Sequence, residues 1–124
     1  IPAGVTTIGV DAFYSCSGLE SVTIPDSVES IGEYAFHNCD NLTSVTIPDS
    51  VTTINNHTFA YCDNLTSVTI PVSVTEIGYQ AFYCCSSLKT VNYKGTQKQW
   101  GQISKNSGNE ALTNATIIYG YTGE

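Results

Sequence analysis

Residues 42–62 read LTSVTIPDSVTTINNHTFAYC, and this stretch returns along the chain every 23 residues. Eight of its positions, from Leu42 to Cys62, recur at the same spacing in the neighbouring copies. All four prolines and all four phenylalanines of the 124-residue chain occupy these positions. A fixed period of about 20 to 50 residues marks a solenoid, in which each repeat buries its apolar face only against its neighbours. The sequence therefore predicts a solenoid with one continuous core.

The period divides the chain into stacked units of a single domain over residues 1–124. The units are residues 1–23, 24–46, 47–69 and 70–92, followed by a closing unit at 93–124 that breaks the period. The first unit begins at its Ile-Pro pair and lacks a first strand. We therefore expect the chain to be a piece of a longer protein, and no signal peptide is recognisable in it.

Each repeat is predicted to be extended on two sides. Alternation of polar and apolar residues over 44–47 predicts a short strand, which Pro48 ends because proline cannot donate to a ladder. The β-branched residues from Val51 to Ile54 predict a second strand on the opposite side of the coil. The convex side should therefore be thin and free of helices in the four repeats.

Two local features are expected between the second strand and the cysteine. The pairs Ala35-Phe36 and Ala81-Phe82 indicate a single turn of α-helix or 3₁₀-helix. Glycine and asparagine most easily adopt positive φ, and they share one position of the repeat. Left-handed backbone is therefore expected at Gly9, Gly32, Asn55 and Gly78.

The closing unit is predicted to contain one short helix and a fifth strand. Residues 96–99 (TQKQ) have the form of a capping box, and Trp100 and Ile103 follow on one helical face. Residues 112–117 repeat the strand signature, 24 residues after Leu88. We expect the helix to replace the side of the repeat that runs from proline to phenylalanine.

The repeat L-x-x-V-x-I-P-x-x-V-x-x-I-x-x-x-A-F-x-x-C resembles the BspA-like, or Treponema-type, leucine-rich repeat of bacterial surface proteins. The resemblance covers residues 1–92, with Asn55 in place of Gly and Thr58 in place of Ala as departures. Together with the closing helix, it implies a mostly β leucine-rich repeat solenoid with a parallel concave sheet and one short capping helix. It also implies an extracellular or cell-surface setting, with roles in adhesion and protein binding and no enzymatic activity.

The charge distribution excludes several classes of ligand. The formal net charge is −7, and residues 1–88 contain nine Asp or Glu residues but no Lys or Arg. An acidic chain without arginine is poorly suited to phosphate backbones or anionic lipids. No apolar run approaches the ~20 residues that span a bilayer. We therefore expect no nucleic-acid partner and no membrane insertion.

Four of the five cysteines recur at the repeat period. Adjacent rungs of a parallel ladder lie ~4.8 Å apart, within the ~4.4–6.8 Å Cα range of a disulfide. Four thiolates in a line cannot close a tetrahedron around a metal, and free cysteine is among the most buried residue types. We therefore expect buried, reduced and metal-free thiols, and no cofactor, at Cys16, Cys39, Cys62 and Cys85.

No set of residues in the sequence has the spacing of a catalytic site. His37 and His57 occupy different positions of the repeat, and no nucleophile is placed beside them. The sequence contains no phosphate-binding loop and no zinc-protease motif. Short acidic rows could gather calcium weakly, although such residues commonly hold turn backbone. These rows are Asp26 with Asp49 and Asp40 with Asp63.

Two surfaces are candidates for recognition. The first is the concave sheet, whose predicted polar columns are Ser21, Ser44, Ser67, Thr90 and Asn114, and Thr23, Thr46, Thr69, Asn92 and Thr116. The second is the turn before the cysteine, which carries Tyr14, Tyr34, His37, His57, Tyr61, Tyr79 and Tyr83. Threonine is also common on any half-exposed strand, and the rings could instead shield the phenylalanine column.

The function that we predict is a cell-surface module that binds an extracellular protein or glycan through the concave sheet and its rim. The alternative is a passive spacer in a larger surface protein. No polar cap precedes the first rung, so we also expect self-association through this open N-terminal rung or continuation of the solenoid upstream.

Overall fold

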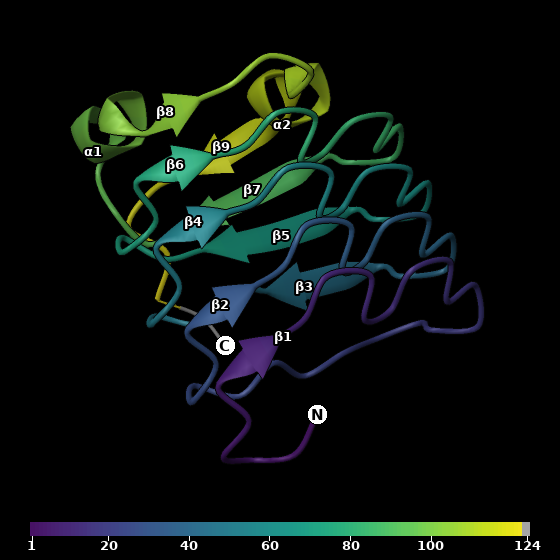
Figure 1. Cartoon of the computed structure of the whole chain (residues 1–124). Helices are drawn as coiled ribbons and strands as arrows, with labels where there is room; N and C mark the ends of the chain where they lie inside the picture. The colour runs from purple at the N-terminus through teal and green to yellow at the C-terminus, as the bar shows by residue number, and fades with distance from the viewer. Residues whose placement is uncertain (123–124) are drawn as a thin grey trace.

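The computed structural model describes residues 1–122 and winds them into stacked rungs with a parallel sheet on each long side (Figure 1). One sheet has four strands in the order β3 (Ser44–Thr46), β5 (Ser67–Ile70), β7 (Thr90–Tyr93) and β9 (Thr116–Ile118). The opposite side carries β1 (Thr7–Ile8) paired with β2 (Ser30–Ile31), and a three-stranded sheet of β4 (Thr53–Ile54), β6 (Glu76–Ile77) and β8 (Ser104–Lys105). The predicted mostly β solenoid with two extended sides is confirmed.

The register of the four-stranded sheet follows the repeat and then shifts in the closing unit. Ser44 pairs with Ser67, and Ser67 pairs with Thr90. Thr90 then pairs with Thr116 instead of Asn114, which is the last residue of helix α2 (Glu110–Asn114). The helix coils the chain so that Leu112 is fully buried, and the strand starts two residues later than predicted. The predicted place of Asn114 in the polar column is therefore wrong.

The core is a set of columns that run through all the rungs. The phenylalanine rings stack almost parallel, with centroids 5.1 Å apart for Phe13–Phe36 and 5.4 Å apart for both Phe36–Phe59 and Phe59–Phe82. The last three rings are fully buried, whereas Phe13 in the first rung is half-buried. Each inner rung thus buries its ring against two neighbours, which is how a solenoid gains stability.

The third side of each rung is a ladder of turns and contains no helix within repeats 1 to 4. Alternate N–H groups donate to the next rung, as Phe36 does to the carbonyl of Thr58 (2.9 Å) and Asn38 does to that of Ala60 (2.8 Å). The residues between them close local turns. The helical turn predicted at Ala35-Phe36 is therefore wrong: the N–H of Ala35 closes a local turn on the carbonyl of Gly32 (3.2 Å), but the N–H of Phe36 bonds to the next rung instead of continuing a helix.

Left-handed backbone occurs on this third side, but not at the predicted glycine position. The positive-φ residues lie two and six positions later and have φ between 52° and 62°; they are Asp11, Tyr34, His57, Gln80, Ser15, Asn38, Tyr61 and Cys84. Glycine is required for another reason, since a Cβ atom on Gly32 would lie 2.6 Å from the backbone nitrogen of Val10. The prediction of positive φ at this position is wrong, and the close approach of two rungs favours glycine at Gly32 and Gly78.

The closing unit contains two helices where one was predicted. Helix α1 (Gln97–Gln102) begins at the capping box that the sequence predicted, with Thr96 as its N-cap. The chain then returns to the second side, where β8 pairs with β6, before it forms α2. Helix α1 therefore replaces only the turn between the first and second sides of the repeat, and the strand of the second side is kept. Both helices lie at the end of the stack opposite the N-terminus (Figure 1).

Candidate interaction surfaces

The four-stranded sheet occupies the place of the predicted concave sheet and presents most of its polar columns. Ser44, Thr46 and Thr116 are exposed, and three neighbours in the ladder are half-buried: Ser67, Thr90 and Asn92. Thr69 is only 7% exposed, because it lies between Thr46 and Asn92 in the ladder. The second column ends at Ile118, which pairs with Asn92 in place of the predicted Thr116. The sheet thus offers hydroxyl and amide groups at its surface.

The remaining predicted residues lie outside this sheet. Ser21 and Thr23 are exposed but belong to a segment that forms no strand. The neighbouring backbone is joined to the next rung by the N–H of Thr43, which donates to the carbonyl of Glu20 (3.2 Å). Asn114 is exposed on α2. The first rung therefore contributes side chains to this surface without extending the sheet.

A hollow of about 510 Å³ lies along the rim of the four-stranded sheet, next to the first rung. Its lining residues are Val22, Thr23, Ile24, Asp26, Thr46, Asp49 and Lys94. The ammonium of Lys94 lies 3.5 Å from a carboxylate oxygen of Asp49, whose side chain is 72% exposed. Asp26 makes no salt bridge within residues 1–122. Two carboxylates face one ammonium, so the hollow carries a net negative charge.

The turn side carries a connected aromatic face, made of Tyr14, Tyr34, His37, His57, Tyr61, Tyr79 and Tyr83. Tyr14 stacks on His37 with centroids 4.8 Å apart, and Tyr34 stacks on His57 at 4.7 Å. Edge-to-face contacts then join Tyr61 to both His37 and Tyr83, and Tyr79 to His57. The hydrophobic core contains none of these rings. The sequence predicted the members of this face, but only the structure shows which rings meet.

His37 lies at the centre of the aromatic face. Partial burial lowers its pKa, the neighbouring His57 lowers it further, and the Asp11 carboxylate partly opposes both. The Nδ1 atom of His37 is buried and has no hydrogen-bond partner within the described residues. Neither His37 nor His57 is hydrogen-bonded to a nucleophilic side chain within residues 1–122. Both rings are instead stacked on tyrosines of the aromatic face.

Three of the four repeated cysteines are buried as predicted, and each thiol has a partner. The Sγ atoms of Cys39, Cys62 and Cys85 lie 3.1 to 3.2 Å from the carbonyl oxygens to which they donate, those of the phenylalanines in the preceding rung. The predicted burial of Cys16 is wrong, because this residue lies in the first rung and packs only partly against the core; Cys84 is exposed. All five are free thiols, and the described residues contain no group of three or more potential metal ligands.

We expect these cysteines to differ sharply in reactivity. Burial raises the pKa of Cys39 to about 12, and interaction with the neighbouring Cys85 thiol together with burial raises the pKa of Cys62. The thiolate is the reactive form, so Cys84 should react first in the native state at pH 8, and Cys16 more slowly. Cys39, Cys62 and Cys85 should react only after denaturation. Counting labelled thiols by mass spectrometry over time measures this, and rapid native labelling of all five would contradict it.

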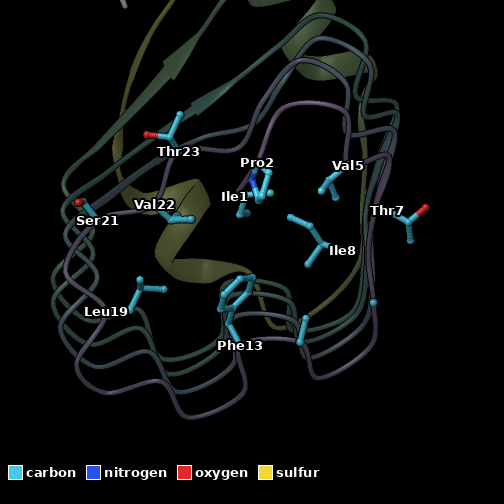
Figure 2. A pocket seen from close by; sticks show the side chains of 12 residues that line it. Ile1, Pro2, Val5, Thr7, Ile8, Phe13, Leu19, Ser21, Val22 and Thr23 are labelled. Atoms are coloured by element: carbon cyan, nitrogen blue, oxygen red, sulfur yellow. The ribbon is translucent and has the colours of Figure 1, made fainter.

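The core is open at the N-terminal rung, where Figure 2 shows apolar side chains around a hollow of about 630 Å³. Ile1, Val5, Phe13, Leu19 and Val22 surround it. Apolar side chains that face such a space favour contact with another apolar surface. The self-association predicted through this rung stays a prediction.

None of the described helices is both long enough and apolar enough to cross a membrane.

Comparisons with known proteins agree with this geometry. A sequence model of the BspA type leucine rich repeat region matches residues 1–108, in six copies. No curated protein matches the chain. Three crystal structures resemble it: a leucine-rich repeat protein from Bacteroides ovatus (32% identity, TM-score 0.64), a leucine rich cell surface protein from Faecalibacterium prausnitzii (38%, 0.68) and the leucine rich repeat protein of T. pallidum (26%, 0.70).

These structures belong to longer chains. The similarity covers 93%, 87% and 100% of the chain described here, but only 25%, 35% and 59% of the respective chains in those crystals. The chain thus spans less than two thirds of each of these relatives.

Proposed function

The chain belongs to the family of BspA-type leucine-rich repeat proteins, and from this premise we propose that it is a cell-surface module that binds an extracellular protein or glycan. Repeat solenoids of this family generally serve protein interaction, and one relative is described as a cell surface protein. The alternative function is that of a passive spacer, which would have no saturable ligand.

The observation that carries this proposal is the ladder of polar side chains on the four-stranded sheet, beside the charged rim hollow. Ser44, Thr46 and Thr116 are exposed on strands that pair in parallel across the sheet. Strands held by backbone ladders lose little conformational entropy when a ligand binds. The hollow adds the carboxylates of Asp26 and Asp49 at the rim. Together they form a broad, shallow surface that suits an extended ligand.

The charges favour a neutral or basic ligand. The rim hollow has two carboxylates for one ammonium, and no Lys or Arg precedes Lys89 in the chain. Complementary charge speeds association, whereas like charge suppresses wrong partners. Nucleic acid and anionic surfaces are therefore poor candidates.

The test starts from a partner identified among purified extracellular proteins and immobilised glycans. Ser44→Lys with Thr46→Lys should weaken binding at least about tenfold, because two long charged side chains enter the surface where the edge strand β3 borders the rim hollow. Thr69 is left unchanged, since it is buried in the ladder. The folds of wild type and variant are compared by circular dichroism, and their affinities by surface plasmon resonance.

The matched control is Thr52→Lys with Thr75→Lys, which adds the same charge at exposed positions on the other side of the solenoid. This control should bind as the wild type does. Equal loss in both variants would show a charge effect without a defined site. Normal binding by the Ser44/Thr46 variant would remove the four-stranded sheet from the interface, and the lack of any saturable partner would favour the spacer.

A further inference from the structure

We propose that the aromatic face is a second docking surface, and that it receives a segment of a partner protein that carries arginine or lysine. This face lies on the turn side of the rungs, and none of its residues belongs to the four-stranded sheet. The proposal is therefore independent of the binding site proposed above.

The rings form a connected surface without serving as core. Tyr14, Tyr61 and Tyr79 are 48%, 41% and 46% exposed, although each contacts another ring of the face. Connected exposed apolar surface of this kind is uncommon on monomers and marks interaction sites. Tyrosine is also among the residues that supply most binding energy in interfaces, since it combines a large rigid ring with a polar end.

The backbone holds these rings in place before any partner arrives. Tyr34, His57 and Tyr61 have φ of 61°, 60° and 61°, a region that non-glycine residues enter only at a cost. Their amides are tied to neighbouring rungs: for example, the N–H of Tyr61 donates to the carbonyl of Tyr83 at 2.7 Å. Rings on so constrained a backbone lose little freedom on binding, which favours affinity.

The charges beside the rings select a cationic partner. Asp11 occupies the same position of the repeat as Tyr34 and His57, and the N–H of Asp11 donates to the carbonyl of Glu33 at 3.1 Å. The side chains of Asp11 and Glu33 are both exposed. No lysine or arginine precedes Lys89, so these carboxylates meet no lysine or arginine side chain within repeats 1 to 3. Guanidinium and ammonium groups are attracted both by carboxylates and by the faces of aromatic rings.

The closing unit already contains one contact of this chemistry. The ammonium of Lys105 lies 4.6 Å from the ring centroid of Trp100, and it also donates to the carbonyl of Trp100 at 2.6 Å. An ammonium is thus held jointly by a ring and by oxygen acceptors. The aromatic face offers a related combination, rings beside carboxylates in place of carbonyls, to a cation from outside the chain.

The experiment uses a short synthetic peptide in which arginine alternates with glycine and serine, labelled for fluorescence anisotropy. A second peptide has citrulline in place of arginine, so that shape is kept and charge is removed. Wild-type protein should bind the arginine peptide and should bind the citrulline peptide at least about tenfold more weakly. The triple variant Tyr14→Leu, Tyr61→Leu, Tyr79→Leu has the wild-type net charge, and it should lose about tenfold or more in affinity for the arginine peptide.

Two control variants separate the rings from other effects. Replacing the same three tyrosines with phenylalanine keeps the rings and should keep most of the affinity. Thr43→Leu, Thr52→Leu, Thr75→Leu places leucine at three exposed positions away from this face and should bind as the wild type does. Circular dichroism should show an unchanged fold for all variants, since none of these positions belongs to the core.

Three results would overturn the proposal. The first is no binding of the arginine peptide by the wild type at millimolar concentration. The second is equal binding by the leucine triple variant and the wild type, which would show attraction to the acidic body alone. The third is ring-dependent binding of a neutral oligosaccharide such as maltohexaose without binding of the arginine peptide, which would identify a glycan surface. None of these results bears on the Ser44/Thr46 variant, so failure here leaves the first proposal to its own test.

Discussion

Phe59→Ala is expected to lower the free energy of unfolding by about 3–5 kcal/mol. The Phe59 ring is fully buried, and its centroid lies 5.4 Å from those of both Phe36 and Phe82. Removing the ring leaves a cavity in the core and breaks both of its stacking contacts. Because most domains have only about 5–15 kcal/mol in total, the variant should be close to unfolding.

Phe13→Ala is the matched control for this change. Phe13 belongs to the same column, but it is half-buried and stacks on one neighbour, Phe36, at 5.1 Å. Solvent already reaches it, so the same truncation should cost clearly less than at Phe59. Urea denaturation followed by far-ultraviolet circular dichroism measures both. Equal losses at the two positions would contradict this prediction, because the Phe59 ring is more deeply buried and stacks on two neighbours instead of one.

Asn109→Ala is expected to lower the free energy of unfolding by about 3 kcal/mol, because it breaks the junction between the last full repeat and the closing unit. Asn109 is only 3% exposed. Its Oδ1 atom accepts from the N–H of Phe82 at 3.0 Å, and its Nδ2 atom donates to the carbonyl of Gly78 at 2.9 Å and to that of Asn106 at 2.8 Å. Alanine would leave buried backbone groups unpaired, each worth about 1–3 kcal/mol.

The position of this asparagine explains why the effect should be large. In the preceding rung the N–H of Phe59 donates to the backbone carbonyl of Ala81 at 2.8 Å. At Phe82 the closing unit provides the side chain of Asn109 instead. The side-chain amide oxygen of Asn109 thus takes the place of the backbone carbonyl that a further rung would supply. It is the last acceptor for this row of amides on the third side.

Asn114→Ala, at an exposed position on α2, is the control and should change stability by no more than about 0.5 kcal/mol. Denaturation measures the global loss for both variants. Hydrogen exchange of the Phe82 amide measures the local loss, and this amide should exchange faster in the Asn109 variant. A global loss below about 1 kcal/mol with unchanged exchange at Phe82 would contradict the assigned role.

The sequence by itself determined the solenoid, the two extended sides and the capping box at Thr96. These features follow from local periodicity, since a strand or a helix cap is set by residues a few positions apart. Of the four cysteines that the sequence predicted to be buried, three are buried, and the sequence also named the residues of both candidate surfaces. An apolar position that returns every 23 residues must face the core in each inner rung, so its burial needs no further information.

Only the tertiary structure decided how neighbouring rungs meet on the third side. The sequence predicted positive φ at Gly32. The structure shows instead that a side chain there would collide with the backbone of Val10 in the preceding rung. Tyr34 and Tyr61 adopt positive φ despite their side chains, because their amides bond to the next rung. Such contacts join residues 22 or more positions apart, and no local pattern encodes them.

The same reason limits what the sequence could determine about the candidate surfaces. Thr69 was predicted on the outer face of the sheet, yet its neighbours in the ladder bury it. Asn114 was predicted in the polar column, but α2 coils to bury Leu112 and brings Thr116 into that place. The contacts between Tyr14 and His37 and between Tyr34 and His57 join successive rungs. Residue identity along the chain sets which groups can reach a surface, and the packing of one rung on the next decides which of them a partner can contact.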